Sequence, residues 1–307
     1  MTNLESAADR PFDLLAYGDP NVDYVFEAAA IPGPDQKVLG RNLGIFPGGT
    51  VANVACAASR LGARVASYGR VGSDPSGALL QRDNDAFGVS NHYVTTVRHP
   101  SAAASIMVDA TGEKALIYAP MLAESLDEVR FAEAARQSRV VYAMPYDLEE
   151  FRRVAAIAHD NGAEVAIDVE AAVAPDAGRL EALLAISDIV FMNEGGFRAS
   201  QDGAVSEANL RPLLGFGPGA IIVTLAEKGA LAVTHDGAWH QPAFPARLVD
   251  ATGAGDCFNG AFLAASLAGQ PVPVVLQFAC AAASLAVSAV GARSGIPDRP
   301  TVEAMLS

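Results

Sequence analysis

The sequence predicts an α/β fold: a mostly parallel central sheet flanked by helices, with a small β-sheet lid. Short apolar runs rich in β-branched residues alternate with longer Ala- and Leu-rich segments of helical period, which is typical of βα units. The strand-like runs are apolar throughout, as expected for a parallel sheet that is covered on both faces. Two stretches, 19–46 and 92–118, interrupt this alternation and predict the lid.

The central sheet is predicted from the apolar runs taken in chain order. The clearest helices between or after them are 51–61, 148–159 and 261–268. We therefore assign residues 11–18, 47–91 and 119–307 to the core. The predicted strands are 14–17, 64–69, 140–143, 164–168, 189–192 and 220–225.

The two remaining stretches predict the lid. Residues 19–46 are rich in Pro, Gly and charge, and the runs 105–108 and 115–118 flank the turn 109–114 as in a hairpin. We expect 19–46 and 92–118 to form an antiparallel flap that closes over substrate and excludes water. The apolar face and open edges of such a flap predict a homodimer formed through the lid.

Composition limits the partners and the compartment. Of 307 residues 51% are apolar, enough for a core, and 35 acidic against 21 basic residues give a net charge of −14. This charge disfavours nucleic acid and membrane surfaces as partners.

Cys56, Cys257 and Cys280 show no CxxC spacing, so we expect neither a disulfide nor a zinc site. With no signal peptide or apolar run of 18 residues, the protein is predicted to be cytoplasmic.

The strongest local motif is segment 250–260 (DATGAGDCFNG), followed by the apolar helical run 261–268. Gly253 and Gly255 let backbone N–H groups approach an anion, and the start of the next helix adds unpaired N–H groups and a positive dipole end. This pattern predicts a phosphate site. Asp256 is either an ordinary acid at a helix start or a base that takes a proton from an attacking hydroxyl, and spacing alone leaves both interpretations open.

A second motif places Gly48 and Gly49 shortly before Asn53 and a predicted helix. The glycines allow a hydroxyl-rich ligand to touch the backbone, and Asn53 offers a donor and an acceptor to sugar hydroxyls. The alternative is a tight turn with Asn53 as the helix N-cap.

A third motif, segment 18–23, follows the first predicted strand. Ligand sites of open α/β sheets gather at the carboxyl ends of strands, where Asp23 could bind two hydroxyls. The alternative is that Asp23 is a turn acid in a cluster of Asp, Pro and Asn.

In this order the three motifs resemble the PfkB (ribokinase-like) family of carbohydrate and nucleoside kinases, over nearly the whole chain. Segment 250–260 is close to the family's C-terminal signature, with Ala251 as its evident departure, and Val51 departs from the looser N-terminal signature. The resemblance implies a ribokinase-like fold, with Asp256 as catalytic base and the Gly253, Ala254 and Gly255 amides as anion hole. It also implies that the acceptor binds to Asn21, Asp23, Gly48, Gly49 and Asn53.

The resemblance further implies ATP as phosphoryl donor with Mg²⁺. Asn193 matches the start of the family's N-x-x-E motif, but Gly196 stands where Glu is usual, so Glu194 or water would substitute. Thr224 and Gly229 resemble the nucleotide-binding turn, with Ala226 replacing a frequent glycine. Asp250, Thr252 and Ser294 resemble elements that bind a monovalent cation, such as K⁺, in many relatives.

The acceptor is the least determined part of the prediction. Several segments look closest to the branch containing ketohexose and sulfofructose kinases. An anionic sugar would need converging cations such as Lys37 and Arg41, whereas Tyr118 and Tyr146 occupy other predicted pocket positions. A neutral sugar is therefore the first expectation. A nucleoside stacked on lid aromatics is the second, and an inactive sugar- or nucleotide-sensing protein, suggested by Gly196 and Ala226, is the third.

Overall fold

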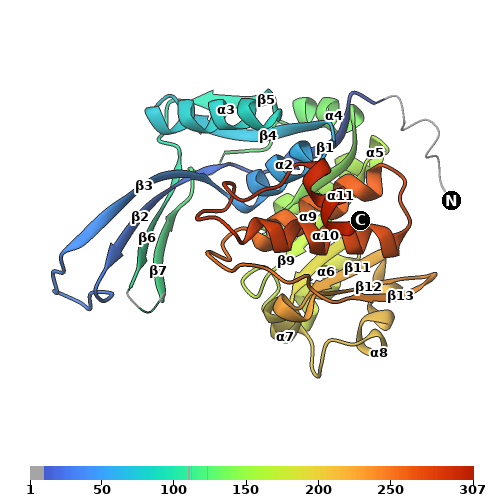
Figure 1. The fold of residues 1–307 in the computed structure, drawn as a ribbon. Coiled ribbons are helices and arrows are strands. Elements are labelled where there is room, and N and C mark those ends of the chain that lie inside the picture. Colours follow the sequence, from blue (N-terminus) through green and yellow to red (C-terminus); the bar gives the residue numbers. More distant parts are fainter. Residues whose placement is uncertain (1–9, 110, 112, 123) are drawn as a thin grey trace.

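The computed structural model describes residues 10–109, 111, 113–122 and 124–307. A nine-stranded sheet forms its centre, in the order β13-β12-β11-β10-β9-β8-β1-β4-β5 (Figure 1). Neighbouring strands are parallel except at one edge, where β12 pairs antiparallel with both β11 and β13. All six predicted strands lie in this sheet. Its members are β1 (Phe12–Tyr17), β4 (Val65–Gly72), β5 (Ser90–Val97), β8 (Ser138–Ala143), β9 (Glu164–Val169), β10 (Ile189–Asn193), β11 (Ala220–Thr224), β12 (Ala230–Thr234) and β13 (Gly237–Gln241).

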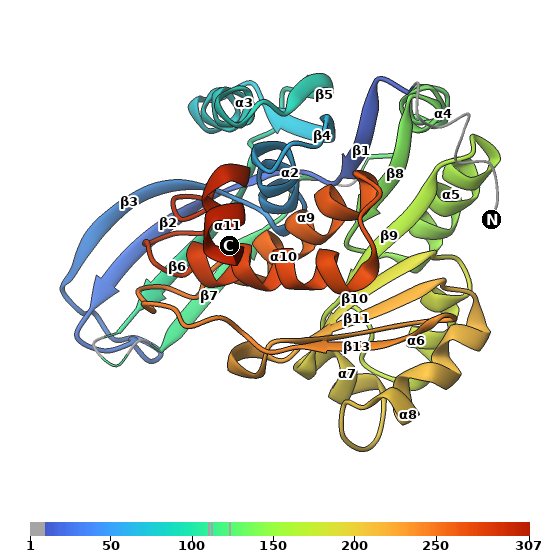
Figure 2. The same ribbon diagram turned by 45° about the vertical axis from the view of Figure 1, so that its right-hand side comes forward.

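Helices cover both faces of the sheet, as the apolar strands predict (Figure 2). Side chains alternate between two cores: Leu14 and Ala16 of β1 pack on one face, and Leu15 packs on the other. The first face carries α2 (Thr50–Arg60), α9 (Ala254–Leu267), α10 (Val272–Ala286) and α11 (Arg299–Leu306), and α3 (Pro75–Phe87) packs beside α2 and β4. The opposite face carries α4 (Glu128–Arg136), α5 (Leu148–Asp160), α6 (Ala177–Leu184), α7 (Glu194–Ser200), α8 (Glu207–Leu210) and η1 (Arg211–Phe216).

A separate four-stranded sheet projects from the body of the molecule and forms the lid (Figure 1). The strand order of the lid is β3-β2-β6-β7. β6 and β7 pair antiparallel and form the predicted hairpin. Residues 110 and 112 of the hairpin turn lie outside the described residues. The lid is not wholly antiparallel, because β2 pairs in parallel with β6. These two strands come from the two separate insertions. The strands are β2 (Asn21–Ala28), β3 (Gly40–Gly48), β6 (Ala102–Val108) and β7 (Lys114–Ala119).

The boundary between lid and core differs from the predicted one. Residues 92–97, predicted as lid, belong to β5, which pairs in parallel with β4 in the central sheet and buries Tyr93. The stretch before β5 forms α3, so β4, α3 and β5 make one βαβ unit, whose second strand is too polar to read as a buried run. Residues 47 and 48, predicted as core, continue β3 in the lid sheet.

Two further observations concern the expected compartment. Cys56, Cys257 and Cys280 are free and buried. Within the described ranges, the helices are too short or too polar for any of them to cross a bilayer. Residues 1–9, on which the expectation of no signal peptide depends, lie outside the described residues.

Candidate active site

Asp256 lies in the first turn of α9, three residues after a glycine whose left-handed backbone other residues rarely adopt. Gly253 is the N-cap with φ of 77°, and a Cβ there would lie 2.7 Å from Cα of Ala292. The Asp256 carboxylate does not cap its own helix. Instead its Oδ2 atom accepts a hydrogen bond of 2.7 Å from Nδ2 of Asn53 on α2. This contact argues against Asp256 being an ordinary acid at a helix start.

The start of α9 offers backbone donors next to open space. The first helical hydrogen bond runs from the Cys257 N–H to the Gly253 carbonyl oxygen, so the Gly255 N–H precedes the helical ladder. A Cβ placed on Gly255 would meet no atom within 4 Å. The Ala254 N–H, however, donates to the Ala251 carbonyl oxygen at 3.2 Å. The amides of residues 253 and 255 are therefore better placed to receive an anion than that of residue 254.

Asn53 is not the N-cap of its helix. Gly49 takes that position and α2 begins at Thr50, which puts Asn53 inside the first turn. Its side chain is 6% exposed and points across to α9, where it contacts Asp256. The N-cap interpretation of Asn53 is wrong because the helix begins four residues earlier than an N-cap at Asn53 would place it.

Asp23 is not a turn acid, because it lies within strand β2 of the lid. Its Oδ1 atom accepts a hydrogen bond of 2.6 Å from Nδ2 of Asn21. A Cβ on Gly48 would lie 2.4 Å from the Asp23 carboxylate, and one on Gly49 would lie 3.1 Å from Oδ1 of Asn21. The residues predicted for the acceptor thus meet where the lid joins the core, next to α2 and α9.

A second carboxylate, missed in the sequence, lies close to Asp256. Asp168 ends the predicted strand 164–168 and is 8% exposed, and its Oδ2 accepts a hydrogen bond of 2.8 Å from Asn259. Burial, together with the charges of Asp256 and Glu170, raises the pKa of Asp168 to about 7. Burial also raises the pKa of Asp256 to about 6, with Glu170 adding to the rise and Asn53 opposing it. The sequence signal that could have identified Asp168 is an acidic residue that follows an apolar run at the end of a predicted strand.

The predicted nucleotide residues lie at neighbouring strand ends. Asn193 and Thr224 are register partners at the carboxyl ends of β10 and β11. Oδ1 of Asn193 caps α7 by accepting from the Gly196 N–H at 2.7 Å. A Cβ on Gly196 would lie 2.0 Å from the Val169 carbonyl oxygen, so this backbone has no room for the usual Glu. The proposed substitute, Glu194, is paired with Arg198 at 2.6 Å.

The turn after β11, which contains η2 (Ala226–Lys228), keeps the backbone of a glycine-rich turn despite its alanine. Ala226 has φ of 52°, in the left-handed region that non-glycine residues rarely adopt. Gly229 has φ of 92°, and a Cβ there would lie 1.9 Å from the Gln241 carbonyl oxygen. Ala226 therefore adopts the backbone conformation that a glycine would favour here, and it does so with conformational strain.

The residues predicted for a monovalent cation share one corner. Asp250 accepts hydrogen bonds from the Thr252 hydroxyl at 2.7 Å and from the Gly291 N–H at 3.0 Å. Burial by itself would raise the pKa of Asp250, but these hydrogen bonds keep that pKa below its usual value. A Cβ on Gly291 would lie 3.7 Å from Oγ of Ser294. Lys114 of β7 also reaches this corner and donates to the Thr252 hydroxyl at 2.8 Å, so the lid contacts the loop before α9.

Together, the doubly covered sheet, the lid and a carboxylate at a glycine-lined helix start define a phosphotransferase with an alcohol group as acceptor. A model of the pfkB family carbohydrate kinases matches residues 12–299, and the chain belongs to this family. The ribokinase of Bacillus subtilis is 28% identical over 299 residues, covering 96% of this chain and 99% of that protein.

Two further proteins resemble this chain over nearly its whole length. A nucleoside kinase of Methanothermobacter thermautotrophicus is 28% identical over 290 residues, covering 93% of each chain. The structure of Arabidopsis thaliana ribokinase complexed with ribose and ATP superposes with a TM-score of 0.85 at 26% identity, covering 96% of this chain and 99% of that one. The ribokinase-like fold expected from the sequence is therefore confirmed.

Proposed function

We propose that this protein transfers the γ-phosphoryl group of ATP to a hydroxyl of a small uncharged sugar. The observation that carries the proposal is the position of Asp256: its carboxylate lies in the first turn of α9 and is hydrogen-bonded to Asn53 beside the lid. This arrangement puts a base between an anion-binding helix start and residues suited to sugar hydroxyls. The ATP and ribose named for the Arabidopsis structure support both substrate classes.

In the proposed reaction Asp256 accepts the proton of the acceptor hydroxyl. The acceptor oxygen forms a bond to the γ-phosphorus, the bond to the bridging oxygen breaks, and ADP leaves. The amides of residues 253 and 255, with the dipole of α9, stabilise the charge on the transferring group. Asn21, Asp23, Gly48, Gly49 and Asn53 orient the acceptor, and Asn193, Thr224 and Gly229 bind the nucleotide.

The donor set fits Mg²⁺ that is held mainly by the nucleotide. Among the described residues, no three His, Cys, Asp or Glu side chains gather where they could hold a metal ion. Mg²⁺ commonly keeps several waters and uses substrate phosphates with one or two carboxylates. Glu170, which follows β9, would bind through water, and Mg²⁺ when bound supplies positive charge to the phosphates. We also propose K⁺ at the corner of Asp250, Thr252 and Ser294.

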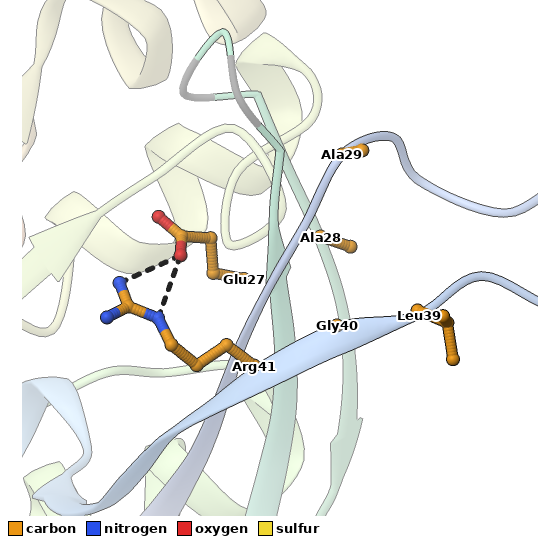
Figure 3. A pocket seen from close by; sticks show the side chains of 6 residues that line it. All are labelled: Glu27, Ala28, Ala29, Leu39, Gly40 and Arg41. Carbon is orange, nitrogen blue, oxygen red and sulfur yellow. Dashed lines mark hydrogen bonds and ion pairs between the residues drawn. The ribbon is translucent and has the colours of Figure 1, made fainter.

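The charges around the acceptor residues favour an uncharged sugar. Arg41 forms an ion pair of 2.8 Å with Glu27 at a cavity of about 380 Å³ in the lid (Figure 3). Glu27 is four residues along β2 from Asp23, which corresponds to roughly 13 Å of strand, so Arg41 is remote from the acceptor. Asp23, Glu170 and Asp256 would instead repel a phosphorylated or sulfonated sugar. A ketohexose, favoured by the sequence, and a pentose, named for the relatives, are the sugars to compare.

A nucleoside is the second candidate acceptor. Tyr118 of β7 and Tyr146 after β8 are partly exposed and interact electrostatically with one another and, respectively, with Asp23 and Glu170. Two aromatic rings at the acceptor site would suit the stacking of a base. The nucleoside kinase among the relatives supports this candidate.

The test is ADP release with ATP, Mg²⁺ and a panel of pentoses, ketohexoses, aldohexoses, sugar phosphates and nucleosides. We expect turnover with an uncharged sugar and a loss of about 100- to 10,000-fold in kcat for Asp256→Asn, with the fold retained. Glu303→Gln, an exposed acid of α11, is the control and should leave kcat unchanged. Ligand binding without ADP formation would contradict the proposal and favour a sensing protein. Preferred turnover of a nucleoside would establish the second candidate.

We also propose that the chain forms a cytoplasmic homodimer through the outer face of the lid. Ile45 and Ile117 lie on one face of the lid sheet and are 49% and 72% exposed. Asp23 and Tyr118 lie on the opposite face, which turns toward the acceptor residues. Light scattering should give the mass of two chains, and Ile117→Lys should give one. Three free buried cysteines suit a reducing compartment.

A further inference from the structure

Arg293 is a buried cation whose guanidinium is held from three sides. The residue follows α10 and is only 7% exposed. Its Nε donates to Oδ1 of Asn53 at 2.8 Å, and Nη2 donates to the Gly48 carbonyl oxygen at 2.8 Å. Nη1 forms an ion pair with the carboxylate of Asp83 on α3. Because a buried charge without partners is very costly, these contacts fix the guanidinium in one position.

The contact with Asn53 decides which way its amide faces. An amide has an oxygen that accepts and a nitrogen that donates, and a guanidinium only donates. Arg293 therefore holds Oδ1 of Asn53 on its own side and turns Nδ2 toward Asp256, 2.7 Å away. If the amide turned over, it would present nitrogen to a cation and oxygen to a carboxylate, so both contacts would become repulsive.

We propose that Arg293 is a positioning residue that acts on Asp256 through Asn53, orienting its carboxylate and keeping it ionised for proton transfer. The inference rests on the proposed function, in which Asp256 is the base. The same guanidinium binds the carbonyl of Gly48, so one side chain joins the acceptor loop to the base. Asp83 neutralises the cation, which allows it to remain buried.

The charges around Asp256 give this contact its importance. Burial is the main cause that raises the pKa of Asp256, Glu170 raises it further, and both Asn53 and Arg293 lower it. Removing the guanidinium would therefore raise this pKa. The titratable and charged groups that face Asp256 are Asp168 of β9, Glu170 after it, Tyr142 of β8, Tyr146 in the next loop, Cys257 of α9 and Arg293.

The test compares Arg293→Met with Arg299→Met by two readouts. Arg299 bonds the Leu61 carbonyl oxygen and stacks on Phe278, so it is a structural arginine from the same end of the chain. For Arg293→Met we expect the acid limb of the kcat profile to move up by about 0.5–1 pH unit and kcat at pH 8 to fall roughly 10-fold. For Arg299→Met we expect a lower melting temperature and an unmoved limb. An unmoved limb in folded Arg293→Met would overturn the proposal.

The second readout does not need turnover. The ¹³C carboxyl signal of Asp256, assigned by its loss in Asp256→Asn, should titrate at higher pH in Arg293→Met than in the unmodified chain. An unchanged titration overturns the proposal even if the chain proves to be no kinase. If the Asp256 signal titrates at higher pH in Arg293→Met but wild type forms no ADP with any acceptor, the proposed function fails and the positioning contact stands.

Arg293→Lys covers the case in which Arg293→Met does not fold. Lysine keeps the charge but cannot bond Asn53, Gly48 and Asp83 together, because it lacks the planar fork. We expect its acid limb to stay near that of wild type while kcat falls. A kcat equal to wild type would show that the fork does not orient Asn53 and would overturn the positioning role.

Discussion

Nδ2 of Asn53 lies 2.7 Å from Oδ2 of Asp256, although 203 residues separate them in the chain. The contact joins the first turns of α2 and α9, two helices packed on the same face of the central sheet. It therefore joins the part of the chain proposed to bind the acceptor to the part proposed to bind phosphate.

The rate of phosphoryl transfer should rise with pH through the pKa of Asp256. Burial raises that pKa to about 6, and the base must be ionised to accept a proton. We expect kcat to fall tenfold per pH unit well below pH 6 and to level off above it. Asp168 lies close enough for the two carboxylates to titrate as a pair, so the limb reports both. A kcat that stays constant from pH 5 to pH 8 would contradict Asp256 as the base.

Asp168 should make the folded chain less stable as the pH rises from about 4 to about 7. Its folded pKa of about 7 lies above the unfolded value of about 3.9, so in this range the folded state binds more protons. Asp168→Asn keeps an acceptor for Asn259 and removes the charge. The melting temperature of the variant should therefore exceed that of wild type at pH 8 and differ less at pH 5. Asp202→Asn, at an exposed position, is the control.

Gly255→Ala should separate stability from nucleotide binding. The new methyl group would project into open space at the start of α9, where we propose that phosphate binds. Alanine favours helix over glycine by up to about 1 kcal/mol, so the melting temperature should stay or rise while KM for ATP increases. Gly178→Ala is the matched control, because Gly178 holds the same second position in α6 on the opposite face. Equal KM values in both variants would count against the phosphate site.

Ala226→Gly should stabilise the turn after β11. The left-handed conformation of Ala226, with φ of 52°, costs an L-residue about 1–2 kcal/mol, and glycine offsets part of that gain by its greater freedom when unfolded. We expect a net gain of up to about 1 kcal/mol in the free energy of unfolding, measured with urea. Ala132→Gly within α4 should instead lose about 1 kcal/mol. A loss in both variants would contradict the strain.

Lys114→Met should weaken ATP binding without unfolding the chain. Lys114 reaches from the lid to the Thr252 hydroxyl, one residue before Gly253, and lies 3.6 Å from Asp250. Exposed ion pairs add little stability, so the melting temperature should change by less than about 2 °C. A cation beside the proposed phosphates should matter more, and KM for ATP should rise about 10-fold. Lys37→Met, at an exposed lid position, should leave KM unchanged.

The sequence by itself determined the fold class, the six parallel strands and the glycine motif before α9. These features are local: an apolar run of four to six residues, or glycines ahead of a helical period, carry their own signal. β5 could not be recognised as a core strand, because its alternating polar residues resemble those of the lid. The parallel pairing of β2 with β6 was equally hidden, since strands from two insertions carry no mark of their partners.

Only the tertiary structure decided what Asn53, Asp23 and Arg293 touch. Each offers the same polar groups in a turn, at a cap or in a buried network, and local spacing does not choose among these positions. The choice is made when α2, α9 and the loop after α10 pack on one face of the sheet and exclude water. Burial then requires partners for each charge, and those partners come from distant parts of the chain.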